Sequence, residues 1–291
     1  MKTISIVTGL SRIVTMGSIF FLVHSPADTL RALALQSSAP LLAGVVGFTV
    51  AAQSNWKQAA VPRSAELRLL LQEGWHLFLS TAAVTLYTNT NVFLVGEIGG
   101  VAQAGYFSAA EKIIRAAQGL LIPLTQVLFP HVNTLVKQSR QVAVRFIRKS
   151  LLTVALPTFA GSLAILLSAP LLARLAFGFA NGTTNSTLRW ISFIPFLVAI
   201  SNIFGIQTMV VFGYEKAFSR ILIVAGVFNV ALACFLIRWM GAPGAGAAVL
   251  ATEAFITFTM LWYLQRIGIH LLRGGPVDES GVGDPSANDV L

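Results

Sequence analysis

Charged residues are scarce in this sequence, and aspartate is especially rare. Only 11% of the 291 residues are Asp, Glu, Lys or Arg, whereas soluble domains carry about 25%. The four aspartates are Asp28, in a short loop, and Asp278, Asp284 and Asp289 near the C-terminus. No acidic pair is placed to hold a metal-bound nucleotide phosphate, and neither a P-loop nor a Ser–His–Asp trio can be assembled. These absences argue against an enzyme.

Cysteine and histidine offer no metal ligands in a recognisable pattern. The single cysteine, Cys234, lies in an apolar run, which excludes an intrachain disulfide and a cysteine metal cluster. The four histidines, His24, His76, His131 and His270, are far apart and show no ligand spacing. We therefore expect neither a metal site nor a cofactor.

Apolar residues dominate what is present. The chain is 55% hydrophobic and has a mean hydropathy of +0.76. This composition predicts an all-α polytopic membrane protein, in which each span needs about 20 predominantly apolar residues. Runs of that length predict about eight transmembrane helices, at residues 3–23, 30–52, 74–96, 103–129, 150–172, 190–212, 220–238 and 243–264.

The 20 Lys and Arg residues are distributed unevenly between the predicted loops. If the N-terminus is cytoplasmic, thirteen of them fall on that side and four on the other, while Arg12, Lys112 and Arg115 fall inside spans. Cytoplasmic loops carry an excess of cations, so the distribution predicts that both termini are cytoplasmic. This topology explains the net charge of +9, and no nucleic-acid partner is expected.

The predicted loop at residues 131–150 combines five cations with interspersed Val, Leu, Phe and Ile. One interpretation is that it binds anionic lipid headgroups or lies along the inner leaflet. The other is that its cations only follow the general excess of positive charge on the cytoplasmic side. The second interpretation needs no ligand, and on the sequence alone we favour it.

Breaks in the pattern predict four regions along the chain. Residues 1–52 hold two spans of a partial N-terminal bundle, and residues 74–272 form a six-helix C-terminal bundle. Between them, residues 53–73 contain Pro62 and an amphipathic run, which predicts a cytoplasmic or interfacial linker. The tail, residues 273–291, is rich in Gly, Pro and acids and predicts a disordered cytoplasmic segment.

The fourth span carries an unusual stripe of polar residues. At helical spacing its polar side chains share one face, and they are Ser108, Glu111, Arg115, Gln118 and Thr125, with Lys112 on a neighbouring face. Glu111 precedes Arg115 by four positions, the favourable order for an ion pair within a helix. Because each ionic group costs roughly 2.5–3.5 kcal/mol at mid-membrane depth, the stripe must face protein or a wet cavity. The alternative is that the charges lie near the helix end and reach the headgroups.

Three other spans contain polar residues of interest. Asn89 and Asn91 lie in the third span and Gln207 in the sixth, where such residues either bind a substrate or join helices to one another. Glu253 lies near the midpoint of the eighth span, where a carboxylate is costly and indicates function by default. Its expected partner is Arg12, Lys112 or Arg115; a protonated Glu253 without a function is the alternative.

Two stretches, "GYFSAAEKI" and "GIQTMVVFGY", together resemble the bacterial polysaccharide exporters known as O-antigen flippases. The similarity extends over about residues 1–272. It implies an all-helical inner-membrane transporter with two bundles around a cavity, which moves an undecaprenyl-pyrophosphate-linked oligosaccharide between leaflets by alternating access. The implied partners are this substrate, membrane lipids, a polysaccharide polymerase, and H⁺ or Na⁺.

The resemblance also assigns roles to residues. It implies a cation-lined cavity that meets the pyrophosphate at Arg12, Lys112 and Arg115, with Glu111 and Gln118 beside them. As our own prediction, Asn89, Asn91 and Gln207 offer hydrogen bonds to sugars, and Glu253 couples to a proton or cation.

Such exporters have twelve or more spans, and the eight spans here match the last two helices of the first bundle and all six of the second. The first four helices are thus expected to be missing, through a misassigned start or a truncated gene. The alternatives to a flippase are an ion-coupled multidrug antiporter of the same superfamily, a membrane glycosyltransferase or ligase, and a non-transporting remnant.

Overall fold

The structure is a computed structural model that describes residues 88–119, 122–178 and 181–271, with scattered residues between 14 and 49 and between 75 and 85. The chain divides into two compact units, Met1–Leu69 and Leu70–Leu291. In the first unit the described residues lie in helical segments. Arg12, the linker at residues 53–73 and the tail at residues 273–291 lie outside the described residues, so the four predicted regions stay a prediction.

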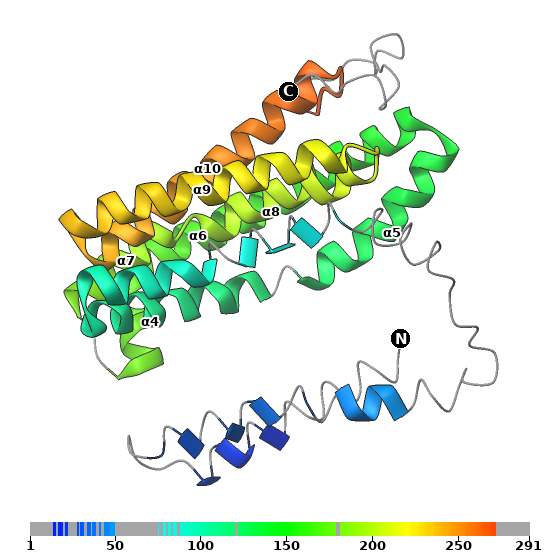
Figure 1. Cartoon of the computed structure of the whole chain (residues 1–291). Helices are drawn as coiled ribbons and strands as arrows, with labels where there is room; N and C mark the ends of the chain where they lie inside the picture. The colour runs from blue at the N-terminus through cyan, green and yellow to red at the C-terminus, as the bar shows by residue number, and fades with distance from the viewer. Residues whose placement is uncertain are drawn as a thin grey trace. The chain divides into compact units, whose positions relative to one another are not determined.

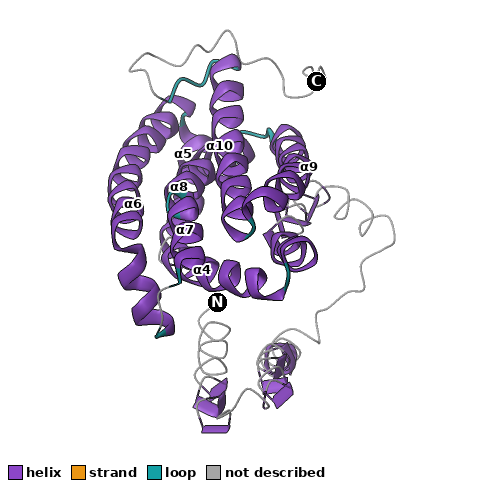
Figure 2. Ribbon diagram, turned by 90° about the vertical axis from the view of Figure 1, so that its left-hand side faces the viewer, coloured by secondary structure: helices purple, strands orange, loops and turns teal. Residues whose placement is uncertain are grey.

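The second unit is built from helices that follow one another with short connections (Figure 1). They are the π-helical turn η3 (Val95–Gly99), α4 (Val101–Gly119), α5 (Ile122–Gln138), α6 (Arg140–Phe177), α7 (Gly182–Ile191), α8 (Ile194–Phe204), the π-helical turn η4 (Gly205–Val210), α9 (Glu215–Met240) and α10 (Ala242–Arg266). Residues 88–94, before η3, are also helical. No strand occurs among the described residues (Figure 2), and the predicted all-α class is confirmed.

Among the described residues, four helical segments are long and apolar enough to cross a membrane: α6, the run Gly182–Val210, α9 and α10. They coincide with the predicted spans at 150–172, 190–212, 220–238 and 243–264. The polytopic membrane character is thereby confirmed. The total of eight spans stays a prediction, because many residues of 3–23 and 30–52 lie outside the described part of the chain.

The predicted span at 103–129 overlaps helices α4 and α5, and residues 120 and 121 between them lie outside the described residues. Helix α4 ends at Gly119 and α5 begins at Ile122. The polar residues from Ser108 to Gln118 therefore belong to α4, whereas Thr125 belongs to α5.

Helix α10 occupies the centre of the second unit and packs against α9, α7, α8 and α4 (Figure 2). Its first turns are rich in small residues, which allow helix backbones to approach closely. A Cβ on Gly244 would collide with the carbonyl oxygen of Leu236, and one on Gly246 would lie 3.1 Å from the Ile191 side chain. The close approach expected of these small residues is present.

A side chain of α4 caps the start of α10. The backbone N–H of Ala242 donates to Oε1 of Gln103 at 3.1 Å, which satisfies one of the N–H groups left without partners at a helix start. Gly241, just before it, has φ 64°, a conformation that residues with a Cβ rarely adopt. The beginnings of α4 and α10 are thus joined directly.

Two apolar clusters hold the helices together. One contains Phe107 and Ile114 of α4 with Ile191 of α7 and Ala245 of α10. The other contains residues from α5, α6, α8, α9 and α10, among them Met260. The first cluster fixes one face of α4 against α7 and α10, and this contact determines where the neighbouring polar face of α4 points.

Candidate functional site

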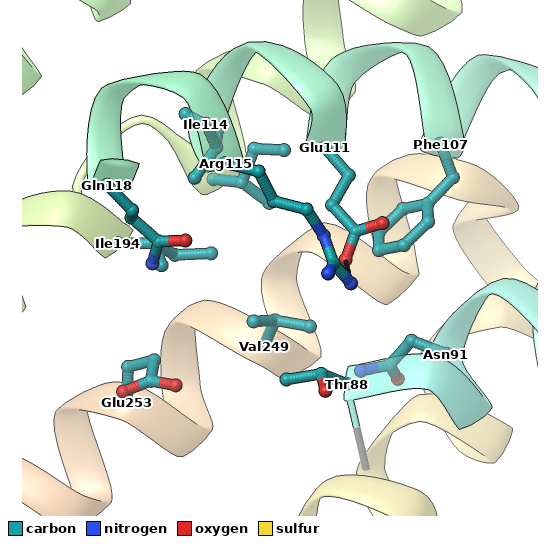
Figure 3. A pocket seen from close by; sticks show the side chains of 11 residues that line it. Thr88, Asn91, Phe107, Glu111, Ile114, Arg115, Gln118, Ile194, Val249 and Glu253 are labelled. Carbon is teal, nitrogen blue, oxygen red and sulfur yellow. Dashed lines mark hydrogen bonds and ion pairs between the residues drawn. The ribbon is translucent and has the colours of Figure 1, made fainter. Parts of the chain in front are cut away.

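A cavity of about 130 Å³ lies between α4, α10, the helix that precedes η3, and the α7–α8 region (Figure 3). Its polar lining residues are Thr88, Asn91, Glu111, Arg115, Gln118 and Glu253, and its apolar lining residues are Phe107, Ile114, Ile191, Ile194 and Val249. A volume of about 10–15 Å³ suffices for one water when polar partners are present. The cavity is therefore large enough and polar enough to be wet.

Helix α4 contributes three of the polar residues from one face. Glu111, Arg115 and Gln118 follow one another at spacings of four and three, so they lie one above another along the helix. Arg115 Nη2 donates to Oε1 of Glu111 at 2.8 Å. The predicted ion pair within the helix is confirmed. The Arg115 side chain is 52% exposed and that of Glu111 21%, so solvent weakens this pair.

The opposite wall is formed by α10. Glu253 is only 6% exposed and lies across the cavity from Gln118 and Arg115 (Figure 3). Val249, one turn earlier, separates Glu253 from the asparagine side of the cavity. A carboxylate in such a position is stable only if it is neutralised or satisfied by polar groups.

The third wall carries Thr88 and Asn91, which are one turn apart on the helix before η3. Asn91 is 1% exposed. The Thr88 hydroxyl donates to the carbonyl of Val84 at 2.8 Å, so its oxygen can still accept a hydrogen bond from a ligand. This wall offers uncharged donors and acceptors.

The charges of the lining residues do not balance. The described lining holds one cation, Arg115, and two acids, Glu111 and Glu253, so its net charge is −1 when both acids are ionised. Protonation of either acid brings it to zero. An anion that enters the cavity must therefore compete with Glu111 for Arg115, and it meets less repulsion when Glu253 carries a proton.

The structure brings together five of the residues predicted for the site, namely Asn91, Glu111, Arg115, Gln118 and Glu253. Three others do not line this cavity: Lys112 and Asn89 are exposed, and Gln207 is buried in η4. Lys112 is about 100° around the helix from Glu111, and Asn89 is about 200° from Asn91. Spacing along one helix explains both of those placements.

A buried hydrogen bond between α9 and α10 was not predicted. Asn229 Nδ2 donates to Oγ1 of Thr252 at 3.1 Å, and Thr252 donates to the carbonyl of Ala248 at 2.8 Å. Asn229 and Thr252 are both fully buried. Because Thr252 immediately precedes Glu253, this bond fixes the rotation of α10 that directs Glu253 into the cavity. A signal existed in the sequence, since both are polar residues inside apolar runs.

Comparisons with known proteins agree with this architecture. Residues 1–136 match the family model described as "Polysaccharide biosynthesis protein". A "Putative O-antigen transporter" of Escherichia coli K12 is 35% identical over 266 residues, which cover 91% of this chain and 64% of that protein. A protein of the same description from Shigella dysenteriae is 29% identical over 263 residues, covering 90% of this chain and 65% of the relative.

The chain therefore spans somewhat less than two thirds of the length of these relatives. No solved structure matches it. The chain is a multi-pass membrane protein, and the matches confirm its resemblance to the polysaccharide exporters and O-antigen transporters.

Proposed function

We propose that the chain takes part in moving an undecaprenyl-pyrophosphate-linked oligosaccharide, such as an O-antigen unit, across the bacterial inner membrane by alternating access. The proposal is supported by the multi-pass helical fold, by the relatives named as transporters and by the cavity with its polar lining residues. In this proposal both termini are cytoplasmic, as the distribution of cations predicts. A polysaccharide polymerase is the proposed protein partner.

The observation that carries the proposal is the position of Arg115 in the cavity. Its guanidinium is held by Glu111 and half-exposed, so an entering phosphate can replace Glu111 as its partner. Arginine binds phosphate through two parallel hydrogen bonds. At about 130 Å³ the cavity accommodates part of a lipid-linked oligosaccharide, and we assign that part to the pyrophosphate end.

The other polar residues have proposed roles around this contact. Asn91 and Gln118 offer hydrogen bonds to the first sugar. Glu253 exchanges a proton or Na⁺, and because a bound cation lowers the negative charge opposite Arg115, cation binding and pyrophosphate binding reinforce each other. Arg12, Lys112, Asn89 and Gln207 are proposed contacts elsewhere along the substrate's path.

The experiment is complementation. The full chain is expressed in a strain that lacks its O-antigen transporter, and surface polysaccharide is measured against the amount of protein in the membrane. We expect Arg115→Ala to abolish export and Arg115→Lys to restore part of it. The matched control is Arg189→Ala, which removes an exposed cation of α7 outside the cavity lining. Normal export by Arg115→Ala at a normal protein level would refute the proposal.

One observation favours a second candidate function. The net charge of −1 in the lining suits a cationic ligand, as expected of an ion-coupled multidrug antiporter. In that case, expression of the chain lowers the susceptibility of cells to cationic drugs, and Glu253→Gln removes the effect. Susceptibility that is unchanged by the wild-type chain excludes this second function without affecting the first.

A further inference from the structure

Helix α6 presents a continuous apolar stripe that no other described helix covers. Its buried face includes Ala143, Ile147, Val154, Ala169 and Ala173. The opposite face carries exposed leucines at intervals of four or seven residues, namely Leu152, Leu156, Leu163, Leu167 and Leu171. Such spacing places the leucines on one side of the helix. In a membrane protein a stripe of this kind faces the acyl chains of the lipid.

The length of the stripe matches the hydrocarbon thickness. From Leu152 to Leu171 the helix advances roughly 28 Å at 1.5 Å per residue, and the hydrocarbon core is about 30 Å thick. Cations stand just beyond both ends of the stripe: Arg145 and Lys149 at one end and Arg174 at the other. At about 100° per residue these three cations lie on the same face as the leucines. The two ends of the stripe therefore mark the headgroup levels.

The cations at the start of α6 divide into two pairs. Arg148 points inward and donates to the carbonyls of His270 at 2.8 Å and Leu271 at 3.2 Å. Arg140 lies over the Phe212 ring, 5.9 Å from its centroid. These two cations serve contacts within the protein, and their positions are explained by the fold.

Arg145 and Lys149 have no such explanation. Both are exposed, and neither forms an ion pair with a carboxylate in the part of the chain that the structure describes. They are four residues apart, which brings their side chains onto adjacent turns of one face. Leu152 and Leu156 continue that face directly into the membrane.

We propose that Arg145 and Lys149 bind the phosphate of an anionic phospholipid, such as phosphatidylglycerol, whose acyl chains lie along Leu152 and Leu156. The arginine supplies a planar, two-pronged donor and the lysine a second positive charge. A free phosphate lacks the contact with the leucines, and a zwitterionic lipid carries a compensating cation. The proposal does not depend on the proposed transport function, because none of these residues lines the cavity.

The test uses the purified full chain in nanodiscs with a phosphatidylglycerol that carries a photoreactive group in one acyl chain. We expect crosslinks on the α6 segment around residues 149–159. Unlabelled phosphatidylglycerol should compete for this labelling, whereas phosphatidylcholine and inorganic phosphate should not. Each surface cation contributes about a fivefold preference for anionic lipid, so R145Q/K149Q should weaken the competition by about 25-fold.

Two variants serve as controls. R174Q removes the single cation at the opposite end of the same stripe and should leave the labelling of residues 149–159 unchanged. R145K/K149R keeps both charges and should retain the competition. Equal labelling of R145Q/K149Q and wild type, or equal competition by phosphatidylcholine, would overturn the proposal. If the double variant fails to fold, the competition arm on the wild-type chain decides alone.

Discussion

Removing the carboxylate of Glu111 tests the electrostatics of the cavity most directly. Glu111→Gln keeps the shape of the side chain, releases Arg115 from its 2.8 Å ion pair, and changes the net charge of the described lining from −1 to zero when Glu253 is ionised. If the cavity receives a pyrophosphate at Arg115, this variant binds it more tightly than the wild type. A variant that loses an ionic contact would thus gain affinity.

The size of the gain follows from Coulomb's law. A unit charge roughly 6 Å from the bound phosphate contributes about 0.7 kcal/mol in water and about 2.8 kcal/mol at an effective dielectric constant of 20. The half-exposed Arg115 side chain places this site between those limits, so we expect about 1–2 kcal/mol, or about a 5- to 30-fold tighter dissociation constant. The loss of stability should be smaller, about 0.3–0.5 kcal/mol, because a solvent-exposed pair within a helix contributes little.

The assay is calorimetric titration of the purified chain with farnesyl pyrophosphate, a short prenyl pyrophosphate. Arg115→Gln should abolish most of the binding, and Glu111→Gln/Arg115→Gln should bind no better than Arg115→Gln alone, because the gain requires the free guanidinium. Weaker binding by Glu111→Gln would refute the reasoning: Glu111 would then hold Arg115 in its productive position or contact the ligand itself.

Three further results are expected. Glu253→Gln removes one negative charge from the lining when Glu253 is ionised, so pyrophosphate should bind more tightly in the same titration. An unchanged affinity would show that Glu253 carries no charge that the ligand meets. Asn229→Ala removes the buried partner of Thr252 on α9 and should lower the free energy of unfolding, measured by thermal denaturation, by about 1–3 kcal/mol. The control variant Thr153→Ala changes an exposed residue, and its free energy of unfolding should stay within about 0.5 kcal/mol of wild type. Gly244→Ala forces α10 away from α9 and should lower the melting temperature. Gly161 has open space for a Cβ, so Gly161→Ala should raise the melting temperature, because alanine stabilises a helix interior by up to about 1 kcal/mol relative to glycine.

The sequence predicts those features that depend on spacing along one helix. The ion pair between Glu111 and Arg115 and the shared face with Gln118 follow from intervals of four and three residues. The burial of Glu253 agrees with its place near the middle of an apolar run. These predictions require no knowledge of which helices are neighbours.

Features that depend on how helices meet could not be predicted in the same way. Gln207 looked equivalent to Asn91 in the sequence, yet it is buried in η4 and does not line the cavity. The bond between Asn229 and Thr252 joins two helices, and helical periodicity gives the face of each helix without the identity of its neighbour.

The cap that Gln103 places on α10 has a mechanical consequence. It pins the starts of two cavity walls, α4 and α10, to each other at a point where Gly241 allows a sharp bend. Because the starts of α4 and α10 are held together, the cavity should widen most easily where the far ends of these helices separate. The solvent route to Arg115 and Glu253 should accordingly enlarge from the Gln118 side.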